Sequence, residues 1–250
     1  IVKENCQLLD VSPDFTMLEQ NELNMLENDI VNEILEEVYG DNTPDSNALL
    51  ELFSNGRNDI NLISSIFQIY KFSVSSANPL KWIEDHFAYY FEDVPVEQTL
   101  WGKYSIERVK SILEYIITKC DKILIDAGDD NKVGVTARNS IIGAVTDMKY
   151  ALDLINSGGK WDDIKNTIDT LKTESFGRFG SAEKDELYYE IVGRTKALDK
   201  DFTSLKSIMT CYSEDFKKDI EYLRPIIFAF KNCVIKFSQR LEEAKIEKNA

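Results

Sequence analysis

The sequence predicts an all-α protein, with compact short helices in residues 1–94 followed by a bundle or arm of long antiparallel helices in residues 95–250. Two observations lead to this class. Glycine (11) and proline (5) are scarce in the chain of 250 residues, a composition that favours helices over strands and turns. Apolar residues recur at helical spacing, whereas no run of useful length alternates apolar and polar residues as a half-buried strand does.

Start and stop signals mark the short helices of the first part. Apolar residues at helical spacing predict a first helix from Leu18 to Tyr39, and Gly40 is expected to end it. Ser, Thr, Asp and Asn favour helix starts because their side-chain oxygens accept hydrogen bonds from free backbone N–H groups. The next three helices are therefore expected to start at Thr43-Pro44, Asp59 and Asn78-Pro79.

From about Pro95 the apolar positions form narrow stripes that step alternately by three and four residues. Long helices that pack nearly antiparallel require such stripes. An irregular, glycine-containing segment, residues 174–181, interrupts them. The stripes predict long helices around residues 106–123, 141–155, 188–209 and 216–241, and a shorter helix from Trp161.

The net negative charge of the chain comes entirely from the first part. The chain has a net charge of -15, and residues 1–100 carry 4 basic against 19 acidic residues, whereas residues 101–250 carry 25 of each. Phosphate should be repelled by the first part, so any contact with nucleic acid is expected beyond residue 100. The alternative interpretation of the acidic residues is a solvated face that keeps the chain in solution.

No catalytic pattern is present in the sequence. The chain has one histidine (His86), four scattered cysteines without a C-x-x-C pair, and no G-x-x-x-x-G-K-[ST] phosphate loop. We therefore predict that the chain alone is not an enzyme and holds no cofactor or metal ion. No stretch approaches about 18 consecutive apolar residues, so we expect a cytoplasmic chain that does not span a membrane. Because the first residue is Ile1 rather than Met, we expect a segment of a longer protein.

Short patterns along most of the chain resemble one protein family. They include Leu49–Phe53 followed by Ser54–Asp59, then Ile66–Tyr70, Asn78–Trp82, Trp161–Asp163, Leu171–Arg178 and Phe237–Lys248. Together they resemble the helical accessory (1B) subdomain of AddA-type ATP-dependent helicase/nuclease proteins, which are UvrD/Rep-like superfamily 1 helicases.

The resemblance implies that residues 1–250 form a single accessory subdomain of an ATP-dependent DNA helicase and exonuclease. Such a parent protein takes part in double-strand break repair by recombination, together with a second helicase-nuclease subunit. Binding of ATP and Mg²⁺ would belong to the parent motor domains and not to this segment. The accessory subdomain would lie near duplex DNA ahead of the motor and hold it by weak, sequence-independent contacts.

Four residues are candidates for contact with DNA. Lys172 and Arg178 flank an irregular loop with Phe176, which we expect to be exposed; cations beside an aromatic ring suit backbone contact and base stacking. Arg57 lies in a glycine-containing loop and could reach a phosphate. For all four, a purely structural role is the alternative, for example an Arg57–Asp59 ion pair. A second hypothesis for the whole chain is a helical scaffold whose acidic first part docks a partner subunit.

Overall fold

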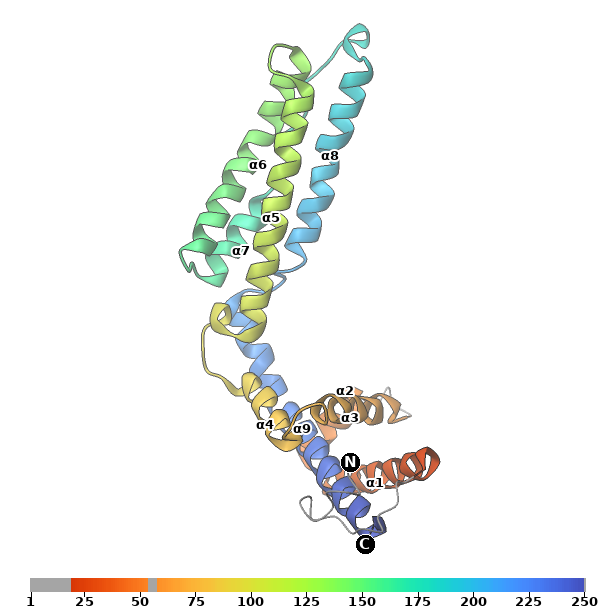
Figure 1. Cartoon of the computed structure of the whole chain (residues 1–250). Coiled ribbons are helices and arrows are strands. Elements are labelled where there is room, and N and C mark those ends of the chain that lie inside the picture. Colours follow the sequence, from red (N-terminus) through yellow and green to blue (C-terminus); the bar gives the residue numbers. More distant parts are fainter. Residues whose placement is uncertain (1–18, 54–57, 250) are drawn as a thin grey trace. The chain divides into compact units, whose positions relative to one another are not determined.

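The computed structural model describes residues 19–53 and 58–249, and every regular element in these two ranges is helical. The predicted all-α class is therefore confirmed (Figure 1). The α-helices are α1 (Gln20–Asp41), α2 (Pro44–Phe53), α3 (Ile60–Ser73), α4 (Pro79–Ala88), α5 (Leu100–Ala127), α6 (Lys132–Asn156), α7 (Trp161–Thr170), α8 (Glu186–Lys206) and α9 (Ser213–Asn249). Short 3-10 segments are η2 (Tyr89–Phe91), η3 (Val96–Gln98) and η4 (Ser181–Glu183).

The chain forms two compact units. The first unit comprises the described residues of Ile1–Glu92 and Asp219–Ala250, and the second unit is Asp93–Lys218. The sequence division at residue 94 is thus corrected in one respect, because most of α9 packs with the short helices and not with the long ones. The physical reason is the apolar stripe of α9, which is buried in the same cluster as α1 to α4.

Aromatic side chains hold the first unit together. Phe237 of α9 is fully buried, and its ring centroid lies 5.3 Å from that of Phe67 and 5.2 Å from that of Tyr70, both on α3. Phe230, two turns earlier on α9, stacks on Phe53 of α2 at 5.2 Å. Aromatic pairs at these distances add to the stabilisation from burial, so α9 supplies the centre of this core.

All three predicted helix starts are confirmed, and two of them carry the expected capping hydrogen bond. The side chains of Thr43 and Asn78 accept hydrogen bonds from the backbone N–H groups of Ser46 (3.2 Å) and Lys81 (3.0 Å). Asp59 precedes α3 but makes no capping hydrogen bond, because its backbone (φ -96°, ψ 13°) lacks the extended conformation of a typical N-cap. Its carboxylate instead accepts a hydrogen bond from the Tyr39 hydroxyl at 2.7 Å.

The end of α1 also differs from the prediction. The helix continues past Gly40 to Asp41, and Asn42 ends it with a left-handed backbone at φ 44°. Asparagine tolerates this conformation better than most residues because its short polar side chain bonds locally. Asn42 therefore takes the place that glycine was expected to have.

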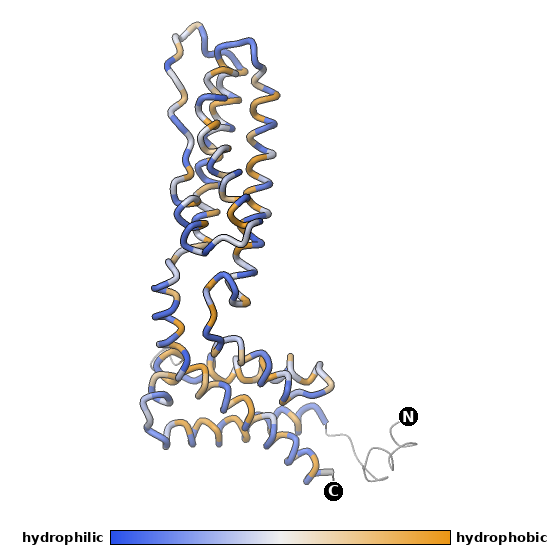
Figure 2. Tube along the Cα trace, turned by 90° about the vertical axis from the view of Figure 1, so that its left-hand side faces the viewer, coloured by the Kyte–Doolittle hydropathy of each residue, from blue (hydrophilic) through white to orange (hydrophobic). Residues whose placement is uncertain are grey.

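In the second unit α5, α6 and α8 lie side by side, and α7 packs beside α6 and α8 (Figure 1). Along each long helix the hydropathy alternates at short intervals, as expected for helices with one buried face (Figure 2). Ion pairs join Lys119 to Asp201 and Asp126 to Arg194 across α5 and α8. Lys119 precedes Asp126 on α5, whereas Asp201, the partner of Lys119, follows Arg194 on α8. The two helices are therefore antiparallel.

Helix α7 holds the turn between α8 and α9. Its Asp162 accepts hydrogen bonds from the backbone N–H (2.8 Å) and the hydroxyl (2.6 Å) of Ser213, the first residue of α9. The indole N–H of Trp161 donates to the Cys211 carbonyl at 2.9 Å, and the Lys165 ammonium donates to the Met209 carbonyl at 2.8 Å. The start of α9 is thus capped from a neighbouring helix.

We expect Asp162→Ala to lower the free energy of unfolding by about 1–2 kcal/mol, because the backbone N–H and the hydroxyl of Ser213 at the start of α9 lose their acceptor. Urea unfolding followed by far-ultraviolet circular dichroism measures the loss. The control is Asp163→Ala, since this neighbour also lies in the first turn of α7. Equal losses in the two variants would contradict the capping role of Asp162.

Candidate nucleic-acid interface

Three of the four predicted contact residues lie in the connection between α7 and α8, residues 171–185, here called the Phe176 loop. The loop is fastened to both neighbouring long helices. On the α6 side the backbone N–H of Glu174 donates to the Ser140 carbonyl at 2.8 Å. On the α8 side Thr173 donates to Asp199 through its N–H (3.2 Å) and its hydroxyl (3.1 Å). The loop is thus a positioned segment although it contains little regular structure.

Phe176 is half-buried, so the prediction that it is exposed is wrong. Its ring centroid lies 5.9 Å from that of Phe179 and 6.0 Å from that of Tyr188. All three rings pack against the buried core of the second unit. Because aromatic residues gain from such contacts, Phe176 fastens the loop to the bundle and offers only part of its ring to a ligand.

Lys172 and Arg178 both project into solvent from this loop. The Lys172 ammonium lies 3.6 Å from the Glu174 carboxylate, and both side chains are largely exposed. Such a pair contributes about 0–1 kcal/mol and is readily exchanged for another partner. Arg178 is exposed, and no ion pair or hydrogen bond of its side chain occurs within residues 19–53 and 58–249. The fourth candidate, Arg57, lies outside the described residues.

Sequence reasoning missed two lysines that contact the aromatic rings of the loop. The Lys132 ammonium lies 4.6 Å from the Phe179 ring centroid and 2.8 Å from the Glu183 carboxylate. The hydrogen bond from Lys132, followed by that from the Gly180 N–H, lowers the pKa of Glu183. Lys184 lies 5.8 Å from the Tyr188 ring centroid. The sequence signal for Lys132 is weak, because this residue precedes the loop by about forty residues, whereas Lys184 lies within the loop itself.

The basic residues near the end of α9 are engaged inside the first unit. Lys236 donates to Glu37 of α1 at 2.8 Å, and Arg240 pairs with the same carboxylate. These two hydrogen bonds, that of Lys236 first, lower the pKa of Glu37. The Lys245 ammonium lies 3.1 Å from the Tyr70 hydroxyl. These three cations of α9 are therefore less available to a phosphate than those of the Phe176 loop.

Two of the cysteines and the histidine are in structural positions. Burial raises the pKa of the Cys120 and Cys233 thiols to about 11, so both are protonated near neutral pH and are weak nucleophiles. His86 stacks on Trp82 with ring centroids 3.9 Å apart. Within the part of the chain that the structure describes, no three His, Cys, Asp or Glu side chains converge as a metal site would require.

None of the helices in residues 19–53 and 58–249 combines the length and apolar character needed to cross a bilayer.

No protein-family model matches the chain. Nearly its whole length is nevertheless similar to proteins that are named as the A component of an ATP-dependent helicase/nuclease. Identity is 21% over 99% of the chain for the protein of Ruminiclostridium cellulolyticum, 25% over 96% for that of Bacillus pumilus and 26% over 100% for that of Clostridium perfringens. In each case the chain spans 20% of the relative's length. The resemblance to an AddA-related region is thus confirmed.

Proposed function

We propose that this chain is a non-catalytic segment of an ATP-dependent DNA helicase-nuclease and that it positions duplex DNA ahead of the motor. The similarity to AddA-type helicase/nucleases over nearly the entire chain carries this proposal. The role belongs to double-strand break repair by recombination. ATP and Mg²⁺ act in the motor domains of the parent protein, and a second subunit completes the assembly.

The second unit is the part suited to hold DNA. It carries 19 basic and 22 acidic residues, whereas the first unit carries 10 basic and 22 acidic residues. Lys172 and Arg178 are exposed cations on a loop that is fastened to two long helices. Contacts of such residues with phosphates are independent of base sequence and position a duplex without reading it.

The test is duplex binding by residues 1–250, measured as the fluorescence anisotropy of a labelled blunt DNA duplex between about 50 and 200 mM salt. We expect weak binding that decreases steeply with salt, and no ATP hydrolysis. In Lys172→Gln/Arg178→Gln the slope of log K against log salt should fall by about two, because about 0.9 ions are released per phosphate contact. Lys149→Gln/Lys160→Gln, which removes two exposed cations elsewhere in the second unit, is the matched control.

Absence of duplex binding even at the lowest salt would overturn the proposal, and so would ATP hydrolysis by the isolated chain. The acidic first unit favours a second candidate function, a scaffold that docks a partner subunit. Co-purification of residues 1–250 with such a subunit, without any binding to duplex DNA, would select this candidate instead.

A further inference from the structure

The outer side of α8 bears positive charge without intervening carboxylates. Residues at steps of four and three, Tyr189, Gly193, Lys196, Lys200 and Thr203, form one exposed line along this helix. The carboxylates of α8 that follow Tyr189 lie on its flanks. Glu190 and Asp201 pair with Arg194 and Lys119, and Asp199 accepts hydrogen bonds from Thr173. The outward line of α8 thus carries Lys196 and Lys200 and no carboxylate between Tyr189 and Thr203, while Asp199 on the flank keeps its negative charge because its Thr173 donors are neutral.

The adjacent edge of α5 continues this charge. The ion pairs Lys119–Asp201 and Asp126–Arg194 fix which side of α5 meets α8. Lys122 lies between these pairs, three residues after Lys119 and four before Asp126, so it emerges at the same edge. Tyr115 and Arg108 precede Lys122 by one and two heptads and share its line. Tyr115 is 61% exposed, and the Lys119 ammonium lies 5.4 Å from its ring centroid.

Four of these cations have no partner in the described part of the protein. Arg108, Lys122, Lys196 and Lys200 are exposed, and no ion pair or hydrogen bond of their side chains occurs among the described residues. Around the Phe176 loop only Arg178 is in the same state, since Lys132 pairs with Glu183 and Lys172 lies beside Glu174. A polyanion can therefore bind to the α5–α8 edge without first displacing a carboxylate from these four residues, which removes one cost of association.

The spacing and shape of the edge suit an extended ligand. Arg108 and Lys122 are 14 residues apart on one helix, a length of about 21 Å at ~1.5 Å per residue. That length corresponds to about six nucleotide steps of ~3.4 Å along a duplex strand. A Cβ atom built at Gly193 would meet no atom within 4 Å, so the backbone of α8 is open to close approach there.

We infer that the α5–α8 edge of the second unit, with Arg108, Lys122, Lys196 and Lys200 as its cations, is the main binding surface for the phosphate backbone of a nucleic acid. This inference rests on the proposed function and deepens it, because it moves the principal contacts from the Phe176 loop to the side of the bundle. The two helices form a rigid support, and tyrosine hydroxyls beside the cations can donate to phosphate oxygens.

The test compares two variants of equal net charge in the whole 250-residue chain. The first is Arg108→Gln/Lys122→Gln/Lys196→Gln/Lys200→Gln. The control is Lys103→Gln/Lys110→Gln/Lys149→Gln/Lys160→Gln, whose four lysines are also without a partner among the described residues and lie off this edge. Binding to a labelled blunt DNA duplex is measured by fluorescence anisotropy between about 50 and 200 mM salt. Circular dichroism melting verifies that both variants are folded.

We expect the first variant to lose about a hundredfold in affinity at ~50 mM salt and its salt slope to fall by about three to four, while the control slope falls by less than about one. Equal losses in the two variants would show a net-charge effect and overturn the inference. Unchanged duplex binding in the first variant, with a loss in Lys172→Gln/Arg178→Gln, would overturn this surface and leave the proposed function standing. Absence of binding by the unchanged chain would overturn both.

A further arm uses poly-glutamate as a protein-like polyanion. If the unchanged chain bound poly-glutamate at this edge but not the duplex, the surface would belong to an acidic protein segment, and the inference would be wrong. Failure of poly-glutamate to displace the duplex at equal charge concentration would support a surface shaped for the phosphate backbone.

Discussion

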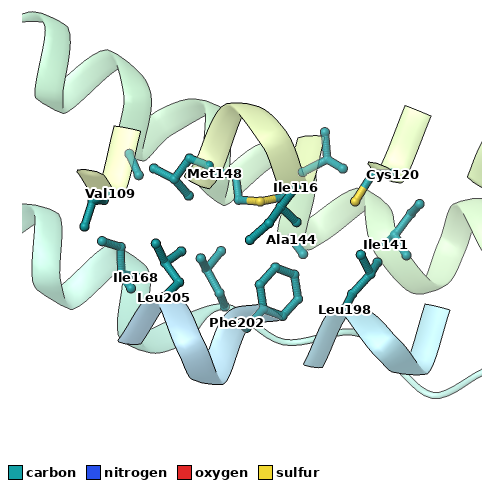
Figure 3. Packing of buried hydrophobic residues seen from close by; sticks show 14 of the residues in the cluster. Val109, Ile116, Cys120, Ile141, Ala144, Met148, Ile168, Leu198, Phe202 and Leu205 are labelled. Atoms are coloured by element: carbon teal, nitrogen blue, oxygen red, sulfur yellow. The ribbon is translucent and has the colours of Figure 1, made fainter. Parts of the chain in front are cut away.

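Replacement of Phe202 by alanine is expected to lower the free energy of unfolding of the second unit by about 3–5 kcal/mol. The side chain is 2% exposed. Figure 3 shows its ring pointing from α8 towards the side chains of α5 and α6, among them Ile116 and Ala144. Removal of the ring abolishes these contacts and leaves a cavity that three packed helices can close only in part.

Urea unfolding followed by far-ultraviolet circular dichroism measures this loss. Tyr189→Ala is the control on the same helix, because it also removes an aromatic ring, but from a side chain that is 64% exposed. Its effect should remain below about 1 kcal/mol. Similar losses in the two variants would mean that Phe202 is not packed as described.

The second large effect is expected from Gly134→Ala near the start of α6. A Cβ atom at this position would lie 1.6 Å from the carbonyl oxygen of Gly128. Because the obstacle is backbone and not a flexible side chain, the turn between α5 and α6 would have to move. We expect a loss of about 2–3 kcal/mol in the free energy of unfolding.

Gly143→Ala on the same helix is expected to have the opposite effect on stability. A Cβ atom there meets no atom within 4 Å, and alanine has the higher helix propensity, so the variant should gain about 0.5–1 kcal/mol. Thermal and urea unfolding of the two variants measure the difference in sign. A gain in Gly134→Ala would contradict the close approach of α6 to the turn.

The features predictable from sequence are those that depend on neighbours along the chain. Alternating steps of three and four residues specify a helix and its buried face, and the caps at Thr43 and Asn78 form with backbone groups three residues away. The apolar stripe of α9 is equally clear in the sequence, but an apolar stripe does not indicate which helices it packs against. For this reason the sequence does not predict the return of Phe237 to Phe67 and Tyr70.

The candidate site is harder to predict from the sequence, because it too depends on contacts between residues that are distant along the chain. Phe176 stands in a segment without periodicity, so nothing nearby indicates that Phe179 and Tyr188 cover its ring. The basic character of the α5–α8 edge depends on which carboxylates are neutralised, and the decisive pair, Lys119–Asp201, joins residues far apart in sequence. The sequence of residues 101–250 shows only that basic and acidic residues are equal in number.

The division into units also has a consequence for folding during synthesis. The second unit is one continuous stretch, Asp93–Lys218, whereas the first needs residues from both sides of that stretch. Helices that are neighbours in sequence pack together early, because only short loops must close between them. Contacts between distant segments form later, because closing a long loop costs more conformational entropy. The long-helix bundle can therefore fold while residues 219–250 are still being added. The core that α1 to α4 share with α9 can be completed only after α9 is made, although these four helices leave the ribosome first.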